Sequence, residues 1–223
     1  MRILNTCAYP EPFKSICENA GLESVHVPFI QHRAIVSKHP EAVPELVLIS
    51  SARTAQYVEN LREWVRESPV HAIGESTARS LLDIGVQVHF VANGSGRSLV
   101  ESVNRVSCSS FWHVGAEILS SPLERSLRHQ KRPFFRWKVY TSFANETLGK
   151  QILALPKISV TCLASPRAAR LLKRHFTGPV VCIGQTTAEE ALKLGLEVVG
   201  VAERTSKESL ASIAVEYVLR YRR

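Results

Sequence analysis

The sequence lacks the residue spacings that metal and redox sites usually require. It holds five cysteines and eight histidines in 223 residues, and they are dispersed along the chain. No CxxC pair and no HExxH motif occurs, so we expect no metal site and no dithiol redox centre. Cys7, Cys162 and Cys182 lie in or beside apolar runs, which predicts reduced thiols buried in a core.

Long hydrophobic runs are missing as well, although hydrophobic residues make up 45% of the chain. No run approaches the roughly 18 apolar residues that a membrane-spanning helix needs. The first apolar stretch, in MRILNTCAYPEPFKS, is too short for a secretory signal. We therefore expect a cytoplasmic protein without a membrane segment.

Motifs for nucleotide binding and for nucleophilic hydrolysis are absent too. Neither GxGxxG nor GxxxxGK(S/T) occurs, so no dinucleotide and no P-loop nucleotide is indicated. There is no GxSxG elbow and no plausible Cys/His pair. No catalytic constellation stands out from the sequence.

Positive charge exceeds negative charge, with 28 Lys and Arg against 20 Asp and Glu, a net charge of +8. A basic surface attracts anions, so nucleic acid, an acidic membrane face or a small polyanionic substrate would each fit. Part of the excess forms a basic run: Arg125, Arg128, Lys131, Arg132, Arg136 and Lys138. Phe135 and Trp137 interleave with this run, so nucleic-acid binding stays an alternative function. The same alternation fits a half-buried strand just as well.

Short apolar runs rich in β-branched residues alternate with helical patterns along the chain. Strands are predicted at residues 2–7, 24–29, 46–49, 70–73, 86–91, 111–114, 134–140, 158–163, 180–183 and 197–201. Helices are predicted at residues 12–19, 54–67, 77–82, 97–103, 122–129, 146–153, 167–175, 187–194 and 207–219. This alternation is typical of βαβ units, so the predicted fold class is α/β, with parallel sheets flanked by helices.

Two stretches of the chain are nearly the same. Residues 72–88 read AIGESTARSLLDIGVQV and residues 182–198 read CIGQTTAEEALKLGLEV, with Ile, Gly, Thr, Ala, Leu, Gly and Val identical. Residues 46–58 (LVLISSARTAQYV) likewise resemble residues 159–172 (SVTCLASPRAARLL). The repeat predicts two similar α/β domains of about 100 residues each.

The repeated loops carry small and hydroxyl residues where a ligand could be held. Ligands of parallel α/β sheets bind beyond the carboxyl ends of the strands, where all four loops are predicted to lie. We expect the glycines to allow sharp turns and the hydroxyl residues to cap the following helices, whose N-termini favour a carboxylate or phosphate. These residues are Gly74, Gly184, Ser51, Ser76, Ser165 and Thr186. The alternative is that they are ordinary helix caps.

This doubled pattern resembles the uroporphyrinogen-III synthase family over residues 46–218. The strongest pieces are IGQTTAEEALKLGL at residues 183–196 and ASPRAARLL at residues 164–172. VYTS at residues 139–142 resembles the VYxT segment of the family. The resemblance implies two similar domains joined by a two-strand hinge, with a substrate cleft between them. One domain would comprise residues 1–33 and 143–223, the inserted one residues 38–138, and the hinges residues 34–37 and 139–142.

The resemblance also implies a cyclising hydro-lyase of tetrapyrrole (haem) biosynthesis. Hydroxymethylbilane, a linear tetrapyrrole polycarboxylate, loses its hydroxyl to give an azafulvene. It then closes to uroporphyrinogen III with inversion of ring D. No cofactor and no metal is implied. The implied protein is a cytoplasmic monomer that contacts hydroxymethylbilane synthase transiently and binds neither nucleic acid nor membrane.

Three residues match catalytic positions of the family. Tyr140 matches the hinge tyrosine, which would assist loss of the hydroxyl through a hydrogen bond, and Thr77 and Thr187 match the threonines of the two Gly-x-x-Thr loops. The implied substrate-binding residues are Ser51, Ser76, Ser165, Thr186, Gly74, Gly184 and Gly115.

The chain also departs from the family pattern. Ala52 stands where Pro is common, Ala164 where Thr or Ser is usual, and Ser142 where VYxT has Thr. Two alternatives therefore stay open. One is a catalytically inactive module of the same fold that binds a tetrapyrrole or another polyanion. The other is a nucleic-acid-binding protein that uses the basic run.

Overall fold

The computed structural model describes residues 1–36, 40–155, 157–176 and 178–220. The chain divides into two compact units, Met1–Gln31 with Phe143–Arg223, and His32–Ser142. Each unit is a sheet with helices on both faces, so the predicted α/β class is confirmed. Residues 37 and 38, where the predicted hinge ends and the inserted domain begins, lie outside the described residues. The predicted domain boundaries stay predictions.

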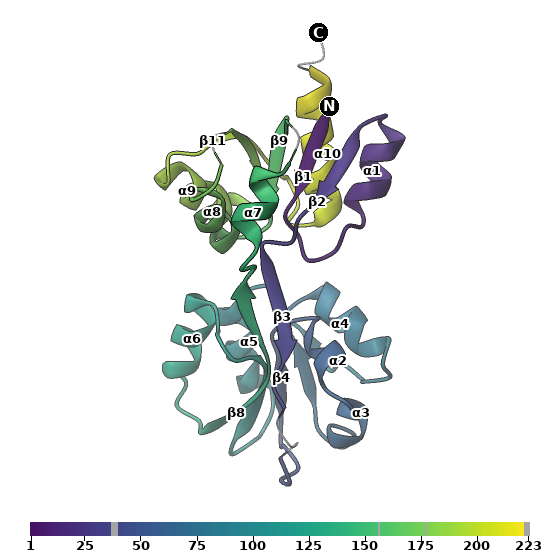
Figure 1. The fold of residues 1–223 in the computed structure, drawn as a ribbon. Coiled ribbons are helices and arrows are strands. Elements are labelled where there is room, and N and C mark those ends of the chain that lie inside the picture. The colour runs from purple at the N-terminus through teal and green to yellow at the C-terminus, as the bar shows by residue number, and fades with distance from the viewer. Residues whose placement is uncertain (37–39, 156, 177, 221–223) are drawn as a thin grey trace. The chain divides into compact units, whose positions relative to one another are not determined.

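The first unit contains a parallel sheet with the strand order β11-β10-β9-β1-β2. Its strands are β1 (Arg2–Asn5), β2 (Glu23–His26), β9 (Val160–Leu163), β10 (Pro179–Cys182) and β11 (Glu197–Val201). Its helices are α1 (Phe13–Asn19), α7 (Leu148–Leu153), α8 (Pro166–Leu172), α9 (Gln185–Lys193) and α10 (Lys207–Arg220). One core joins α7, α8 and α9 to one face of the sheet, and another joins α1 and α10 to the opposite face (Figure 1).

The second unit contains a sheet with the order β3-β8-β7-β4-β5-β6. Its strands are β3 (Ile30–Ala34), β4 (Val47–Ile49), β5 (Val70–Ala72), β6 (Phe90–Val91), β7 (Phe111–Ala116) and β8 (Phe134–Ala144). Its helices are α2 (Thr54–Tyr57), α3 (Leu61–Trp64), α4 (Glu75–Leu82), α5 (Gly96–Glu101), the 3-10 helix η1 (Ser102–Arg105) and α6 (Ser121–Arg128). One core lies under α2, α3 and α4, and another under α5, η1 and α6. The chain passes between the units within β3 and within β8.

The sequence repeat is a structural repeat. Both α4 and α9 are followed within three residues by a glycine with positive φ, 76° at Gly85 and 71° at Gly195, a conformation that glycine adopts without steric cost. After Gly85 the amide of Val86 donates to the Leu81 carbonyl over 2.9 Å and turns the chain back toward the sheet. The same residues of the repeat therefore end equivalent helices and lead into equivalent strands.

One long helix predicted from the sequence is wrong. The pattern at residues 54–67 forms two short helices, α2 and α3, separated by Val58 in an extended conformation and Asn60 with φ 58°. Val58 and Leu61 are both buried in the same core. The break allows the two short helices to bury both side chains against one sheet face.

Other boundaries shift at the sheet edges. The strand predicted at residues 86–91 is reduced to β6, and the strand β3 was not predicted as a strand of the sheet. The strand predicted at residues 134–140 extends to Ala144 as β8. The three cysteines predicted to be buried thiols, Cys7, Cys162 and Cys182, are free and buried. No helix of the described residues is long and apolar enough to span a membrane.

Candidate functional site

The predicted site residues of the second unit gather at the carboxyl edge of its sheet. Ser51 follows β4 and Gly74 follows β5, while Gly115 lies near the end of β7. Tyr140 of β8 pairs with Ala116, so it lies at the same edge. Parallel pairing of β4 with β5 and β7 brings the carboxyl ends of these strands together.

The predicted residues of the first unit gather in the same way. Ser165 follows β9, and Gly184 follows β10, which is parallel to β9. Thr186 and Thr187 lie in the first turn of α9. Each unit therefore carries its own carboxyl edge with matching loops.

Glycine, and no hydroxyl side chain, occupies the N-cap of both repeated helices. Gly74 precedes α4 and Gly184 precedes α9, and neither cap makes a side-chain hydrogen bond. The prediction that Ser76 and Thr186 cap these helices is wrong, because both lie inside the first turn. The predicted sharp glycine turns are wrong too, since φ is −176° at Gly74 and 178° at Gly184, which is extended backbone.

The uncapped helix ends leave amide donors at both edges. The first amides of a helix have no partner within the helix, and they carry a partial positive charge. In α4 the first residue is acidic, Glu75, whereas α9 has the neutral Gln185 at the matching position. The α9 edge is therefore the better of the two for an anion.

The two serines after the strands differ from each other. Ser165 caps α8, where its Oγ accepts a hydrogen bond from the Ala168 amide over 3.1 Å, as predicted. Ser51 does not cap α2. Its Oγ accepts from the Arg53 amide over 3.2 Å and closes a local turn, and Arg53 holds the cap position.

The two predicted catalytic threonines are almost completely buried. Thr77 is 2% exposed in α4 and Thr187 is 3% exposed in α9. Their amides donate to the Gly74 and Gly184 carbonyls over 3.0 and 3.1 Å. Each threonine is therefore buried within the first turn of its helix.

Tyr140 lies in an aromatic and basic environment and is 4% exposed. Its ring stacks on Tyr57 with a centroid distance of 5.2 Å, and His32 approaches edge-on with a centroid distance of 6.0 Å. The Arg53 guanidinium carbon lies 5.9 Å from the ring centroid. The ring is thus held on several sides, which fixes the direction of its hydroxyl.

Sequence reasoning missed a polar cluster beside Gly115. His113 of β7 is fully buried, and its Nε2 lies 2.8 Å from Ser50 Oγ. Burial, with the nearby Arg136 charge as a smaller cause, lowers the pKa of His113 to about 3. The ring is therefore neutral near pH 7. Histidine in an otherwise apolar strand was the only sequence signal for this cluster.

Some residues of the basic run lie on strand β8, and others line a groove. Trp137 is buried while Phe135 is 49% exposed, as the half-buried strand predicts. Arg136 donates to the Ala116 carbonyl over 2.7 Å, and Arg132 donates to the Val103 carbonyl over 2.9 Å. These two cations therefore hold backbone groups of the same unit.

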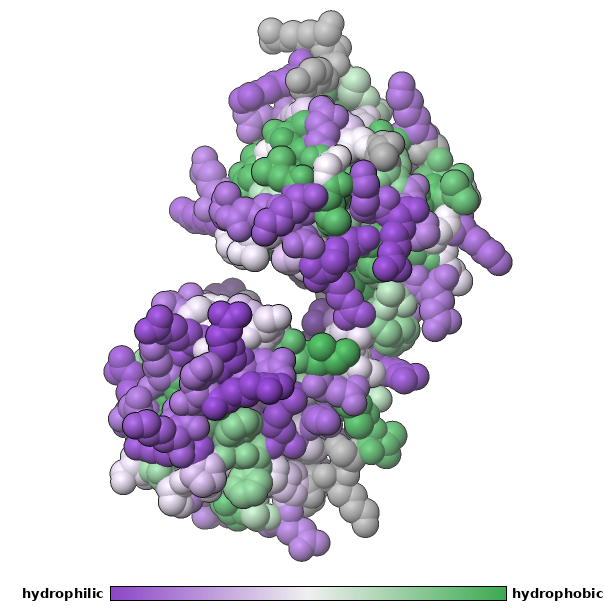
Figure 2. Space-filling view, turned by 90° about the vertical axis from the view of Figure 1, so that its left-hand side faces the viewer, coloured by the Kyte–Doolittle hydropathy of each residue, from purple (hydrophilic) through white to green (hydrophobic). Residues whose placement is uncertain are grey.

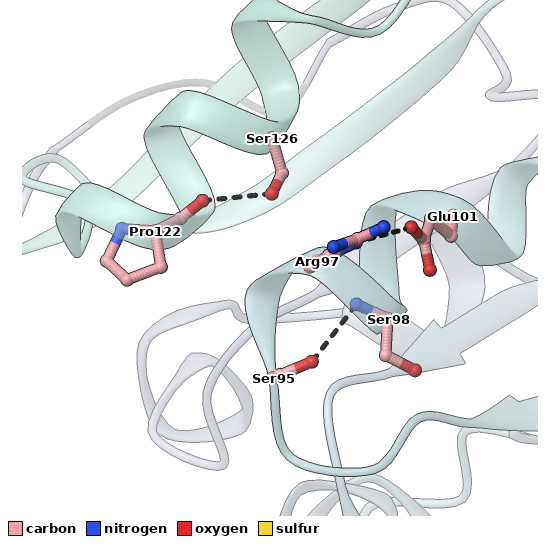
Figure 3. A network of polar contacts seen from close by, with 6 residues as sticks. All are labelled: Ser95, Arg97, Ser98, Glu101, Pro122 and Ser126. Atoms are coloured by element: carbon pink, nitrogen blue, oxygen red, sulfur yellow. Dashed lines mark hydrogen bonds and ion pairs between the residues drawn. The ribbon is translucent and has the colours of Figure 1, made fainter.

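The groove lies between α5, η1 and α6 and has a volume of about 710 Å³. Arg97, Arg125, Lys131 and Arg132 line it, together with Glu101. Figure 3 shows the Arg97–Glu101 ion pair, 2.7 Å long, on α5 near α6. Hydrophilic residues gather over this face of the second unit (Figure 2).

Metal ligands do not cluster in the part of the chain that the structure describes, where no group of three or more His, Cys, Asp or Glu side chains could hold an ion. The donors at the two edges are backbone amides, hydroxyls and one tyrosine. Such donors suit an anionic ligand that must be oriented.

These features define a duplicated α/β protein that offers amide and hydroxyl donors to an anion at two sheet edges. A scan against protein-family models matches residues 11–212 to the family described as uroporphyrinogen-III synthase HemD. The chain belongs to the uroporphyrinogen-III synthase family. It is a cyclising lyase of tetrapyrrole biosynthesis with a small-molecule tetrapyrrole substrate, and nothing in the comparisons favours an inactive module.

Solved structures agree on the fold. Uroporphyrinogen-III synthetase from Helicobacter pylori is 18% identical with a TM-score of 0.72, covering 97% of this chain and 100% of that one. A mutant uroporphyrinogen III synthase from Thermus thermophilus is 15% identical with a TM-score of 0.64, covering 99% of this chain and 98% of that one. A search of curated proteins finds no match.

Proposed function

We propose that the chain closes hydroxymethylbilane to uroporphyrinogen III, with inversion of ring D and loss of water, and that both carboxyl edges contact this substrate. Family membership supports the reaction. The observation that carries the assignment of the edges is the matching pair of helix N-termini at Gly74 and Gly184, neither capped by a side chain.

The chemistry needs orientation more than it needs a strong acid or base. Once the hydroxyl has left, the azafulvene is reactive enough to close by itself, and spontaneous closure gives the type I isomer. An enzyme must therefore hold the chain in the conformation that closes at the substituted carbon. Amide donors at α4 and α9, with the hydroxyls of Ser51 and Ser165, would bind carboxylates without adding fixed charge. Ser76, Thr186 and Gly115 would complete these contacts.

Tyr140 would assist departure of the hydroxyl by donating a hydrogen bond to it. Its contacts with Tyr57, His32 and Arg53 support this role, because they fix the ring before substrate binds. Thr77 and Thr187 would bind the substrate through their hydroxyls from the first turns of their helices. Because both side chains are buried, each turn would have to move slightly to expose its hydroxyl.

The net charge of +8 would speed capture of the polyanionic substrate. Since that substrate is unstable, a transient contact with hydroxymethylbilane synthase would shorten its time in free solution. We propose that the chain acts as a monomer in the cytoplasm.

A coupled assay tests the proposed reaction. Purified hydroxymethylbilane synthase generates the substrate, the chain is added, and the oxidised products are separated by isomer. Type III isomer above the level without the chain is the expected result. Type I isomer alone would overturn the proposal, and tight binding of uroporphyrin III without turnover would support the inactive module instead.

A further inference from the structure

A buried histidine and a partly exposed serine form a pair at the carboxyl edge of the second unit. His113 is fully buried, and its Nε2 lies 2.8 Å from Ser50 Oγ. Ser50 is the first residue after β4, directly before Ser51. Ile49 pairs with Val114, so Ser50 lies next to Gly115 across the two parallel strands.

The tautomer of His113 follows from its surroundings. His113 Nδ1 is buried, and it has no hydrogen-bond partner among the described residues. A buried N–H without an acceptor is rarer in folded proteins than an unpaired acceptor, so the proton lies on Nε2. His113 therefore donates to Ser50 Oγ, and the Ser50 hydroxyl keeps its own hydrogen to donate elsewhere.

A second Ser–His pair in the same unit shows what a purely structural arrangement looks like. His71 Nδ1 lies 2.7 Å from Ser102 Oγ, and both residues are 2% exposed. There the Ser102 hydroxyl donates to the Leu99 carbonyl over 2.6 Å. Its hydrogen is used inside the protein, whereas no acceptor for the Ser50 hydrogen is found within the described ranges.

The Ser50 and Thr54 hydroxyls approach the same side of Gly115, which has no side chain to separate them. A side-chain carbon on Gly115 would lie 3.4 Å from Ser50 Oγ and from His113 Cε1, and 3.6 Å from Thr54 Oγ1. Thr54 is fully buried, and its hydroxyl has no partner among the described residues. Of these two hydroxyl groups the Ser50 hydroxyl is partly exposed, so it can donate to an oxygen of a ligand.

The duplicated unit provides an internal comparison. The strand pairing places Asn5 of β1 at the position that His113 occupies in β7, and the repeat places Ala164 where Ser50 stands. Asn5 Nδ2 donates to the Tyr9 carbonyl over 3.1 Å, so the side chain supports its own loop. Among the residues that the structure describes, the second unit alone carries the histidine and the free hydroxyl together.

We propose that Ser50 is a further substrate-binding residue, which donates its hydroxyl hydrogen to a carboxylate oxygen of the tetrapyrrole, and that His113 is the positioning residue that holds Ser50 in place. The inference rests on the proposed function, because Ser50 lies at the edge proposed to bind substrate. A carboxylate oxygen fits better than a neutral group, since the Ser50 hydroxyl is a donor and a charge-assisted hydrogen bond is the stronger one.

Steady-state kinetics with hydroxymethylbilane test the proposal. Ser50→Ala should raise KM about tenfold, as expected for loss of a hydrogen bond to a charged group, with a smaller change in kcat. His113→Leu should raise KM to a similar extent. The double variant should be no worse than either single variant, because both act through one hydroxyl. His113→Gln, which keeps an N–H donor, should recover part of the loss.

The matched control is Ser102→Ala with His71→Gln, which breaks the structural Ser–His pair and should leave KM unchanged in protein that remains folded. Wild-type KM in folded Ser50→Ala would overturn the proposal. Additive losses in the double variant would overturn the positioning role of His113.

Failure of the proposed reaction is recognised separately, because the wild type would then form no type III isomer. In that case titration with uroporphyrin III compares Ser50→Ala with wild type, and equal affinity overturns the Ser50 assignment.

Discussion

Tyr140 stacks on Tyr57 with their ring centroids 5.2 Å apart and their planes inclined by 25°. The two rings come from β8 and from α2, which the chain separates by more than half of the second unit. An offset aromatic pair of this kind contributes about 1 kcal/mol beyond its buried area. It therefore holds a proposed catalytic side chain still and also stabilises the fold.

Tyr140→Phe should lower turnover while the fold stays intact. The phenyl ring keeps the contact with Tyr57, so the melting temperature should change little, but the hydrogen bond to the leaving hydroxyl is lost. Turnover and the isomer ratio are measured in the coupled assay. Tyr57→Phe is the matched control, since it changes the partner ring and spares the proposed donor. Wild-type turnover in Tyr140→Phe would remove Tyr140 from the mechanism.

Ser165→Ala should destabilise the first unit by about 1 kcal/mol, because it removes the N-cap of α8. Ser76→Ala should change the free energy of unfolding much less, since Ser76 caps no helix. Urea unfolding of both variants measures the difference. Equal destabilisation would show that the Ala168–Ser165 hydrogen bond contributes nothing.

Glu75→Gln should improve substrate binding. It removes a negative charge from the first turn of α4, where the anion is proposed to bind, and gives α4 the same polarity as α9 at Gln185. We expect KM to fall by about two- to threefold at low salt, and stability to fall by about 0.5 kcal/mol because the helix dipole loses a favourable charge. The KM difference should shrink as salt is added. An unchanged KM at low salt would place the α4 end away from the substrate.

Acid should destabilise the second unit through its buried histidines. The pKa of His113 falls from 6.5 to about 3 in the folded state, and that of His71 falls to about 4, in both cases mainly through burial. Between about pH 4 and 6.5 the unfolded chain binds more protons than the folded chain. Stability is therefore full above pH 6.5 and is lost as the pH falls, with a slope of at most about 1.4 kcal/mol per pH unit for each histidine.

His113→Leu should flatten this pH dependence. The free energy of unfolding is measured by urea titration from pH 7.5 to 4.5, for wild type and variant. His129→Gln, at an exposed position, is the control and should follow the wild-type curve. A variant curve as steep as that of the wild type would show that His113 is not the group that titrates.

Several parts of the fold were predictable because they depend on local patterns. The repeated Gly-x-x-Thr-Ala segments begin α4 and α9 at equivalent places, and the turn glycines Gly85 and Gly195 follow the two helices. Parallel pairing then brings the predicted loops to the carboxyl edges. The break between α2 and α3 could not be predicted in the same way. It depends on the burial of Val58 and Leu61 in one core, which Asn60 with its positive φ allows.

The sequence alone determined the α/β class, the duplication and the family, because strand and helix periods, turn glycines and repeated motifs are properties of neighbouring residues. Only the tertiary structure decided which hydroxyls are caps, which are buried and which remain free to donate. Ser165 accepts a hydrogen bond from an amide of its own helix, and Thr77 is buried within the first turn of α4. Ser50 lies within hydrogen-bond distance of His113, which belongs to a strand far away in the sequence. The physical reason is that hydrogen-bond satisfaction depends on partners far apart in the chain, whose positions are set by packing of the whole unit.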